Sequence, residues 1–355
     1  MRLNVHQINE IFFLFNSLFW ETRYTIVRKR IPIFLERYSD KILKTGIYLS
    51  VINQCGKTFD FPFDCEPMVY TCEERFYAER IDASYRFTSK ELLRLLIEES
   101  DLFGRLKSIK HYFFMDQGDY IVQFMDLAGE ELEKDINDIS PNRLDSLLEL
   151  ALRTSMMNFD PYKDDVRIEL LPDSLLTQMY KIINIGHEID EKDLSDSQSL
   201  KGNEALALTF HVPWPLSLIL TKRNITCYQM LFRHLFYCKF VERQLEDVWK
   251  GNKIAKSFTL NAVTGYAQAF ALRQKMLNFV QNLEYYIMVE VIEPNFHHFL
   301  ETASSKTNSI DEMSQHHQDF IDKCLRDAML TSSDLLQIVD KLLHLCVSYS
   351  EFMKV

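Results

Sequence analysis

"NITCYQMLFRHLFYCKFVERQLEDVW", residues 224–249, carries one of the clearest helical patterns in the chain. Apolar or aromatic residues recur along it at intervals of three, four or seven: Tyr228, Leu231, Leu235, Cys238, Leu245 and Trp249. That spacing places them on one side of an α-helix. The stretch therefore predicts a long helix with a single buried stripe.

The segment just before this helix, "FHVPWPLSLIL" (210–220), pairs Trp214 with Pro215. A proline disfavours the α conformation in the residue before it, so an extended segment cannot pass smoothly into a helix here. We expect Trp214 and Pro215 to form a rigid structural corner between an extended strand and the helices, with the Trp214 ring packed against a helix face.

Helical periodicity extends over most of the remaining chain. In the N-terminal part, helices are expected at 1–20, 22–53, 67–83 and 88–103. The segment 108–134 is expected to form two helices joined by a tight turn at 116–119. Further helices are expected to begin at Pro141 and to cover 261–294. In the turn, Gly118 can adopt a positive φ and Asp119 can cap the next helix. Ser140 and Pro141 form a helix start signal. Gly56, Pro62 and Pro67 interrupt the pattern, so 53–67 is expected to be a loop.

Two short segments have strand character. "DVRIELLP" (165–172) and "ALALTFHV" (205–212) alternate apolar and polar residues, which predicts a small antiparallel β-hairpin. Between them, a short helix is expected at about 173–185. The following insert, about 186–204, is acidic and polar and is expected to be mobile.

Composition supports an all-α fold. Among 355 residues there are only nine glycines and nine prolines, fewer than the turns of a sandwich, a barrel or a doubly wound sheet require. The formal net charge of −11 argues against a general nucleic-acid binder, because such proteins neutralise phosphates with Lys and Arg. The apolar run "IFFLFNSLFW" (11–20) is too short to span a bilayer, so no membrane insertion is expected.

The sequence shows no catalytic pattern. Phosphate-binding glycine loops, H-E-x-x-H and G-x-S-x-G are all absent. The neighbouring pairs His297-His298 and His316-His317 do not converge on a metal and are expected to be solvated or to cap helices. Asp160, Asp164 and Asp165 are expected in a solvated loop, and the seven cysteines as free thiols that are mostly buried. We therefore expect no enzyme, no cofactor and no metal site.

Several segments, taken together, resemble the gamma-tubulin complex protein family. They follow one another in collinear order: "FWETRYTIV" (19–27), "IPIFLERYSDKILKTGIYLSVINQCG" (31–56), "SIKHYFFMDQGDYIVQFMDLAGEEL" (108–132), "VPWPLSLIL" (212–220), "YQMLFRHLFYCKFVERQLEDVW" (228–249) and "LRQKMLNFVQNLEYYIMVEVIEP" (272–294). The resemblance covers nearly the whole chain. Family members have a longer N-terminal bundle and continue beyond "LLHLCVSYSEFMKV", so this chain is expected to be a fragment or a shortened variant.

The resemblance implies an all-helical rod of two consecutive bundles, with the β-hairpin in the second. Residues 1–104 would be the C-terminal part of a bundle that contacts other gamma-tubulin complex components laterally. Residues 105–355 would bind gamma-tubulin. The implied function is a non-catalytic scaffold that templates microtubule nucleation at centrosomes and spindle poles, in the cytoplasm. Any GTP would belong to gamma-tubulin. An α-helical adaptor or tethering protein for another cytosolic partner is the alternative.

Candidate contacts with gamma-tubulin lie in two places. The apolar flanks of "MDQGD" present polar side chains at a helix–helix turn, and the later helices carry polar or amphipathic residues beside their apolar stripes. The candidates are Asp116, Gln117 and Asp119 in the turn, and Arg233, Arg273, Asn278, Gln281 and Tyr285 on the helices. A plain turn, and hydrogen bonding inside the bundle, are the alternative roles of these residues.

Overall fold

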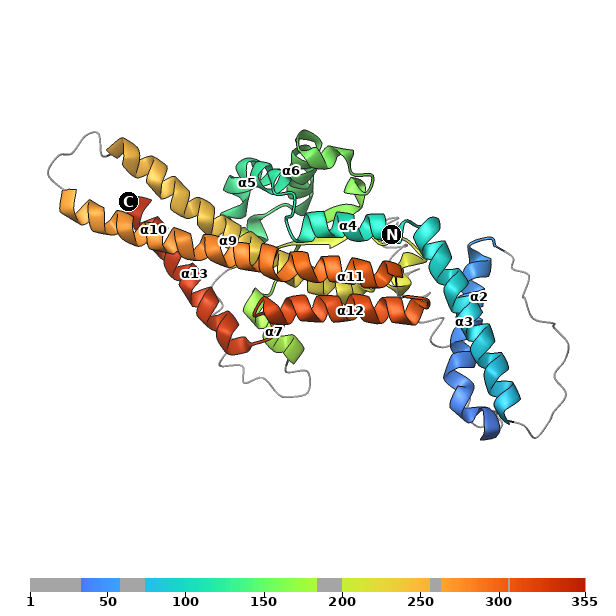
Figure 1. The fold of residues 1–355 in the computed structure, drawn as a ribbon. Helices are drawn as coiled ribbons and strands as arrows, with labels where there is room; N and C mark the ends of the chain where they lie inside the picture. Colours follow the sequence, from blue (N-terminus) through green and yellow to red (C-terminus); the bar gives the residue numbers. More distant parts are fainter. Residues whose placement is uncertain (1–32, 58–73, 184–199, 256–262, 306, 355) are drawn as a thin grey trace. The chain divides into compact units, whose positions relative to one another are not determined.

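The computed structural model describes residues 33–57, 74–183, 200–255, 263–305 and 307–354, which form two compact units (Figure 1). The described residues that fall within Met1–Asp101 and Thr307–Met313 form the first unit, and those within Leu102–Lys306 and Ser314–Val355 form the second. Apart from one β-hairpin, the regular elements described are helices, which confirms the all-α prediction. None of the helices in these ranges is both long and apolar enough to cross a membrane.

The first unit is built on two helices, α2 (Ser39–Gln54) and α3 (Glu74–Glu98), which pack against each other and follow the 3-10 helix η2 (Ile33–Tyr38) (Figure 1). Its buried apolar side chains come from both helices and from the start of α12: Tyr48, Val51 and Ile52 from α2, Tyr77, Leu92, Leu93, Leu95 and Leu96 from α3, and Ile310 and Met313 from α12. The expected helix at 1–20 and the first part of the one at 22–53 lie outside the described residues.

Helix α3 corrects one prediction. Separate helices were expected at 67–83 and 88–103, but one continuous helix spans the expected break. Residues 84–87 contain no glycine or proline, and the hydroxyls of the region bond inside the helix. Ser84 Oγ donates to Arg80 O at 2.9 Å and Thr88 Oγ1 donates to Ser84 O at 2.8 Å. Because these polar groups are satisfied along the helix, nothing interrupts it.

The end of α2 agrees with the loop expected at 53–67, as far as the chain is described. Cys55 is the C-cap and Gly56 has a φ of 78°. A residue in this left-handed region ends a helix, and glycine adopts it without steric cost.

The second unit contains most of the helices and both strands. Its elements are α4 (Leu102–Phe113), α5 (Asp119–Leu132), η3 (Ile136–Asp138), α6 (Pro141–Thr154), η4 (Met156–Phe159), η5 (Lys163–Asp165), β1 (Val166–Leu170), α7 (Leu175–Ile183), α8 (Gly202–Ala205), β2 (Leu206–Phe210), η6 (Leu216–Leu218), α9 (Lys222–Ala255), α10 (Val263–Tyr285), η7 (Tyr286–Ile292), α11 (Glu293–Ser305), all but the start of α12 (Ile310–Asp327), and α13 (Ser333–Lys354).

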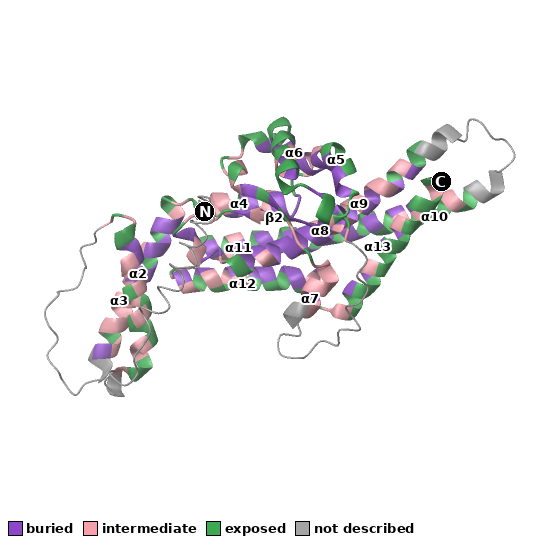
Figure 2. Ribbon diagram, turned by 180° about the vertical axis from the view of Figure 1, so that it is seen from behind, coloured by how far each residue is buried: buried purple, intermediate pink, exposed green. Residues whose placement is uncertain are grey.

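Helix α9 is the centre of this unit. It contacts α4, α7, α8, α10, α13 and β2, and its middle is almost entirely buried (Figure 2). The predicted stripe residues Tyr228, Leu231, Leu235, Cys238 and Leu245 are buried, but residues on the other sides of the helix, such as Phe232 and Phe236, are buried too, so the prediction of a single buried stripe is wrong. Among the predicted stripe residues Trp249 is the exception, because its side chain is 44% exposed and lies edge-on to the Phe270 ring.

The turn between α4 and α5 has the expected position but a different backbone. Gly118 has a φ of −73°, so the predicted positive φ is wrong. Met115 carries it instead, with a φ of 53° and a buried side chain. Since a left-handed conformation is unfavourable for a residue with a Cβ, packing of the Met115 side chain must hold the turn.

Helix α6 begins at Pro141 with Ser140 at the N-cap, as predicted, although the Ser140 side chain makes no capping hydrogen bond. The β-hairpin is also confirmed. β1 and β2 are antiparallel, with Val166 opposite Phe210 and Leu170 opposite Leu206. The backbone N–H of Ile168 donates to Asp145 Oδ1 at 2.7 Å, which ties the hairpin to α6.

The region expected to be a mobile insert is only partly described. Residues 186–199 lie outside the described part, whereas Lys201 forms a bridge with Asp135 and Gly202 begins α8. A Cβ at Gly202 would lie 3.0 Å from the carbonyl oxygen of Leu132 and 2.5 Å from a methyl of Ile139. The last residues of this stretch are therefore packed closely against α5 and the η3 region.

The Trp-Pro corner lies between β2 and η6, where the chain turns toward α9. The Trp214–Pro215 peptide bond is cis. Trp214 is 42% exposed, so it is not a buried residue of the corner. Leu216, Ile219 and Leu220, which follow it, are the buried residues of the corner.

The predicted end of a helix before Pro294 is also corrected. α10 continues through η7, which is a π-helix, directly into α11. A proline inside an α-helix lacks the N–H that would bond to the preceding turn. The wider turns of η7 come just before Pro294, and π-helical segments are a common way for helices to accommodate such an interruption.

Candidate functional site

The histidines expected to be solvated behave differently from each other. His297 is exposed and lies 3.5 Å from Glu301, but His317 is fully buried. Its Nδ1 is 3.1 Å from Asn224 Nδ2 and its Nε2 is 2.8 Å from Tyr228 Oη. Burial lowers the pKa of His317 to about 3, so the ring is neutral. This histidine is a core residue, and the solvated expectation was wrong for it.

No cluster of three or more metal-ligating side chains occurs in the described part of the chain. Asp165, expected in a solvated loop, forms a 2.6 Å ion pair with Arg105, whose guanidinium also lies over the Tyr162 ring. Asp160 accepts a hydrogen bond from Ser108 at 2.9 Å. These carboxylates therefore fasten the end of η4 and η5 to α4. The described cysteines are free thiols and four of the five are buried, as expected.

Two of the predicted contact residues are internal. Arg233 is buried and donates to Gln178 Oε1 and to the carbonyls of Asp173 and Glu204, each at 2.7 Å. Burial lowers its pKa to about 10, so it stays charged at neutral pH. Its guanidinium joins α7 and α8 to α9.

Arg273 is buried as well. It donates to Leu245 O at 3.3 Å, and its guanidinium lies 5.1 Å from the centre of the Trp249 ring. Both arginines hold helices together, which was the alternative reading of these positions, and neither presents its charge to a partner.

Asp116 and Gln117 are exposed at the turn between α4 and α5, which we call the tip. Asp116 Oδ2 lies 3.0 Å from His111 Nδ1 and 3.4 Å from Lys110 Nζ. Asp119 points elsewhere: its Oδ2 accepts a 2.7 Å hydrogen bond from the backbone N–H of Met156. Asp119 therefore positions η4, which carries the strongly exposed side chains of Met156 and Phe159.

Asn278, Gln281 and Tyr285 lie on the solvent side of α10. Tyr285 is 58% exposed, and large apolar or aromatic residues accompany it along the same side of α10 and η7: Leu272, Phe279, Tyr286 and Val289. We call these four residues, with Asn278 and Tyr285, the α10 face. Leu272, Phe279 and Tyr286 are spaced by seven residues, which keeps them in one row along a helix.

Lys110 connects the tip to the α10 face. Its Nζ lies 2.6 Å from Glu293 Oε2 as well as 3.4 Å from Asp116 Oδ2. Glu293 follows directly after η7, so the exposed carboxylates of the tip lie close to the end of the apolar row. Asp116, predicted from the turn, is thus linked through Lys110 to the start of α11, which continues from the helix that carries Tyr285.

Sequence reasoning missed Lys110, Glu293 and the apolar members of the face. The seven-residue spacing of Leu272, Phe279 and Tyr286 was visible in the sequence, but the same spacing also describes a core stripe. Only the structure shows that this row faces solvent.

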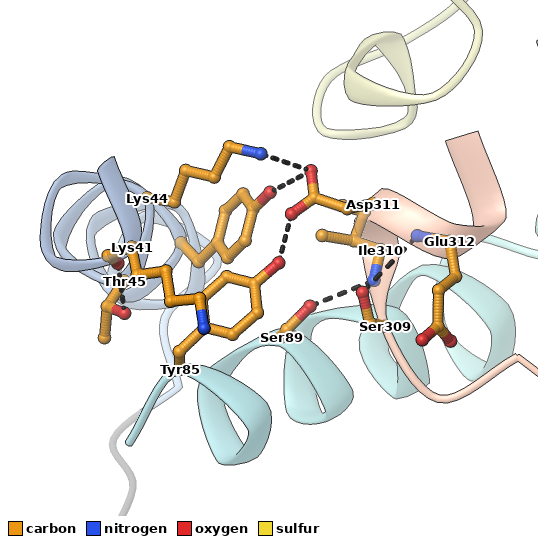
Figure 3. Close-up of polar contacts among 10 residues, drawn as sticks. Lys41, Lys44, Thr45, Tyr85, Ser89, Ser309, Ile310, Asp311 and Glu312 are labelled. Atoms are coloured by element: carbon orange, nitrogen blue, oxygen red, sulfur yellow. Dashed lines mark hydrogen bonds and ion pairs between the residues drawn. The ribbon is translucent and has the colours of Figure 1, made fainter. Parts of the chain in front are cut away.

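A second polar cluster lies in the first unit, at the start of α12 (Figure 3). The Asp311 carboxylate accepts hydrogen bonds from Lys44 Nζ at 3.0 Å, from Tyr48 Oη at 3.0 Å and from Tyr85 Oη (Figure 3). Ser89 Oγ accepts the backbone N–H of Ile310 at 3.0 Å. We call this arrangement the Asp311 clamp.

The electrostatics of the clamp favour an ionised Asp311. Partial burial opposes its charge, but the hydrogen bonds from Tyr85, Lys44 and Tyr48 hold its pKa below the usual value. Burial and the same carboxylate raise the pKa of Tyr85 to about 12. Lys44, Tyr48 and Tyr85 thus all donate to the Asp311 carboxylate, which makes the clamp a structural element of the first unit.

An exposed row of apolar and aromatic side chains beside a polar turn is typical of a surface that binds another protein. The similarity of this chain to known protein families supports the same class, a protein that binds other proteins. The gamma tubulin complex component N-terminal family model matches residues 4–99, and the gamma tubulin complex component C-terminal family model matches residues 102–355. The chain belongs to the gamma-tubulin complex component family.

Individual relatives are similar over almost the whole chain. It is 47% identical to gamma-tubulin complex component 2 of Mus musculus over 96% of its length, and 46% identical to the gamma-tubulin complex component 2 homolog of Drosophila melanogaster over 95%. It is 31% identical to the spindle pole body component alp4 of Schizosaccharomyces pombe over 94%. The chain spans 38%, 39% and 49% of the lengths of these three relatives.

Proposed function

We propose that this chain is a non-catalytic scaffold that binds gamma-tubulin. Three observations support the proposal: the match to both regions of the family, the names of the relatives as components of gamma-tubulin complexes, and an exposed surface in the C-terminal region suited to protein binding. The α10 face carries the proposal, because a half-exposed row of aromatic and apolar residues on a long helix is unfavourable in water unless a partner covers it.

The mechanism would be geometric. Residues from about 105 onward would hold gamma-tubulin, and residues 1–104 would contribute to lateral contacts with other complex components. Several gamma-tubulins held side by side would present αβ-tubulin with a ready-made end to grow from, so that it need not form a nucleus unaided. The place of action would be the microtubule-organising centre, at centrosomes and spindle poles in the cytoplasm.

The surface we assign to gamma-tubulin combines the tip and the α10 face. Aromatic side chains in the centre of an interface commonly account for most of its binding energy, with polar residues at the rim. We therefore expect Phe279, Tyr285 and Tyr286 to contribute most of the affinity. Asp116 and Gln117, at one end of the row, would set orientation through polar contacts.

Size-exclusion chromatography with light scattering, with and without gamma-tubulin, tests the proposal. We expect a one-to-one complex. Replacing Phe279 and Tyr285 together with alanine should weaken it by about tenfold or more, since interface aromatic residues often contribute ~1–2 kcal/mol or more each. Asp116→Ala with Gln117→Ala should have a smaller effect.

Leu345→Ala is the matched control, because Leu345 is a comparably exposed apolar residue on a different helix, α13, and is not part of the proposed surface. It should leave binding unchanged. A folded wild-type chain that binds no gamma-tubulin would contradict the proposed function. Full binding by the Phe279 and Tyr285 variant would show instead that another surface makes the contact.

A further inference from the structure

A group of charged side chains lies between α9 and α10, next to part of the surface proposed to bind gamma-tubulin; its two glutamates are buried, and its lysine is about one-third exposed. Lys239 Nζ contacts Glu242 Oε2, and lies 3.5 Å from Glu284 Oε2. Glu242 Oε1 accepts a 2.8 Å hydrogen bond from Gln281 Nε2. One ammonium group thus serves two carboxylates, and its contact with Glu284 is the weaker one.

Glu284 is left incompletely paired. The residue is 9% exposed, and its Oε1 has no hydrogen-bond partner among the described residues. A buried carboxylate oxygen without a donor is costly when the group is ionised, because the hydrogen bonds that it makes in the unfolded, solvated chain are lost on burial. A proton bound to Glu284 removes that cost.

The neighbouring carboxylates act in the same direction, and Lys239 opposes them. The groups that face Glu284 from α9 are Lys239, Glu242 and Glu246, and the Cys238 thiol also interacts with it. Two like charges close together disfavour ionisation of both, and a single lysine cannot balance them. Burial, with the nearby carboxylates and against the attraction of Lys239, raises the pKa of Glu284 to about 7.

Two residues of α10 connect the protonation state of Glu284 to the exposed side of that helix. Gln281, which holds Glu242, lies on the solvent side of α10, and Tyr285 follows Glu284 directly. Ionisation of Glu284 would add repulsion against Glu242 and draw Lys239 between the two acids. Both changes would loosen the hydrogen bond that fixes Gln281 and the turn of α10 that carries Tyr285.

We propose that Glu284 is a proton-binding site in the α9–α10 interface, and that its protonated form holds the α10 face in the conformation that binds its partner. The proton site itself stands on the geometry of the Lys239–Glu242–Glu284 group. Its effect on binding rests on the function proposed above.

Thermal unfolding as a function of pH tests the proton site without any partner. The folded chain keeps a proton on Glu284 that the unfolded chain has already released, so the stability that this proton gives is complete at low pH and is lost as pH rises through the folded pKa. We expect the wild-type melting temperature, taken relative to that of Glu284→Gln at each pH, to fall between about pH 5 and about pH 8, because only the wild type loses a proton from this site.

Two further variants make the result specific. Glu130→Gln, at an exposed helical position on α5, should keep the wild-type profile. Glu242→Gln frees Lys239 to pair with Glu284 alone, so the fall should move to lower pH. The same slope in Glu284→Gln and wild type, with both folded by circular dichroism, would overturn the proton site.

Binding of gamma-tubulin across the same range tests the link to the surface. We expect the wild-type chain to bind gamma-tubulin about fivefold more tightly at about pH 5 than at about pH 8, which is a weak coupling for two linked sites. Glu284→Gln should bind with little dependence on pH. Wild-type binding with no dependence on pH, or the same dependence in Glu284→Gln, would overturn the link and leave the proposed function intact. Absence of binding at every pH would contradict the proposed function, while the unfolding experiment still decides the proton site.

Discussion

At the scale of single residues, several polar side chains that looked suited to contact a partner serve the interior instead. Arg233 and Arg273 are charged residues beside apolar stripes, a pattern that fits a binding surface as well as a buried hydrogen-bonding network. The sequence cannot separate the two, because the acceptors that Arg233 uses are backbone carbonyls from distant segments. Tyr285 illustrates the opposite case, since a residue that a helical pattern could equally place in the core lies exposed.

The Asp311 clamp gives the first prediction. Asp311→Asn keeps the shape of the side chain but removes the charge that Lys44, Tyr48 and Tyr85 contact. Hydrogen bonds to a charged group contribute roughly 1.5–3 kcal/mol when well shielded, and less at this partly exposed site. We expect amide hydrogen exchange to become faster in α2 and α3, and to stay unchanged in α9.

Acidification should have the same effect on the clamp. The folded pKa of Asp311 lies below its usual value, so the stability it contributes is present above that value and is lost as pH falls through the folded pKa. In Asp311→Asn, the protection of the α2 and α3 amide hydrogens against exchange should therefore decrease less in strong acid than it does in the wild type. If the substitution leaves exchange in both helices unaltered, the clamp contributes no measurable stability.

His317 gives a second prediction, with a different pH window. Its folded pKa of about 3 lies below the value of an unfolded histidine, about 6.5, so the unfolded chain binds a proton first as pH falls. Stability should decline from about pH 6.5 downward by at most about 1.4 kcal/mol per pH unit for this one group. His234, whose pKa burial lowers to about 4, adds to the decline.

His317→Asn, which can retain a hydrogen bond to Tyr228 or Asn224, should show a shallower decline in denaturant titrations at a series of pH values. His297→Asn, at an exposed site, is the control and should follow the wild type. An equal slope in all three proteins would mean that His317 does not stay neutral in the folded chain.

At the scale of elements, the sequence predicted the features that depend on residues close together in the chain. The tip turn, the start of α6 at Pro141, the hairpin and helix α9 all follow from spacing and from the nearest few residues. The unbroken α3, and the passage of α10 through η7 into α11, depend on how a helix accommodates an interruption. Gly118 and Met115 show the limit most clearly, because burial of Met115 overrides the preference of glycine for a positive φ.

Helix α13 offers a test of the two sides of one element. Leu343 is buried, whereas its neighbour Leu342 is half-exposed on the outer side, in a row with Leu335, Ile338 and Leu345. Leu343→Ala should lower the free energy of unfolding by about 2–5 kcal/mol, because it leaves a cavity. Leu342→Ala should change it by less than about 1 kcal/mol. Urea denaturation of the two variants checks the difference, and equal losses would mean that the outer row is also covered.

At the scale of the whole molecule, the first unit is not one continuous piece of chain. Thr307–Met313, which lies in the region matched by the C-terminal family model, is part of the first unit. Ile310 and Met313 are fully or almost fully buried. Sequence patterns cannot show such a return, because a segment of seven residues has no periodicity of its own and its partners lie more than 200 positions away.

This organisation predicts how a shortened chain would behave. A fragment beginning at residue 102 lacks α2 and α3, and with them Ser89 and every partner of Asp311 described above. We expect the first turn of α12 to exchange its amide hydrogens much faster in this fragment than in the full chain, with little change in α9. Equal protection of Ile310 in the two proteins would show that α12 does not need the first unit to form its N-terminal turn.

The half-exposed tryptophans have an optical consequence. Trp214 and Trp249, the tryptophans of the described residues, are each more than 40% exposed in the folded chain. Their emission should already be shifted toward the red in the native protein, so unfolding would change its wavelength little. Trp249 rests against Phe270 and under Arg273, where α9 meets α10. Its fluorescence intensity should instead report movement between these two helices, which makes it an intrinsic reporter for occupancy of the neighbouring surface.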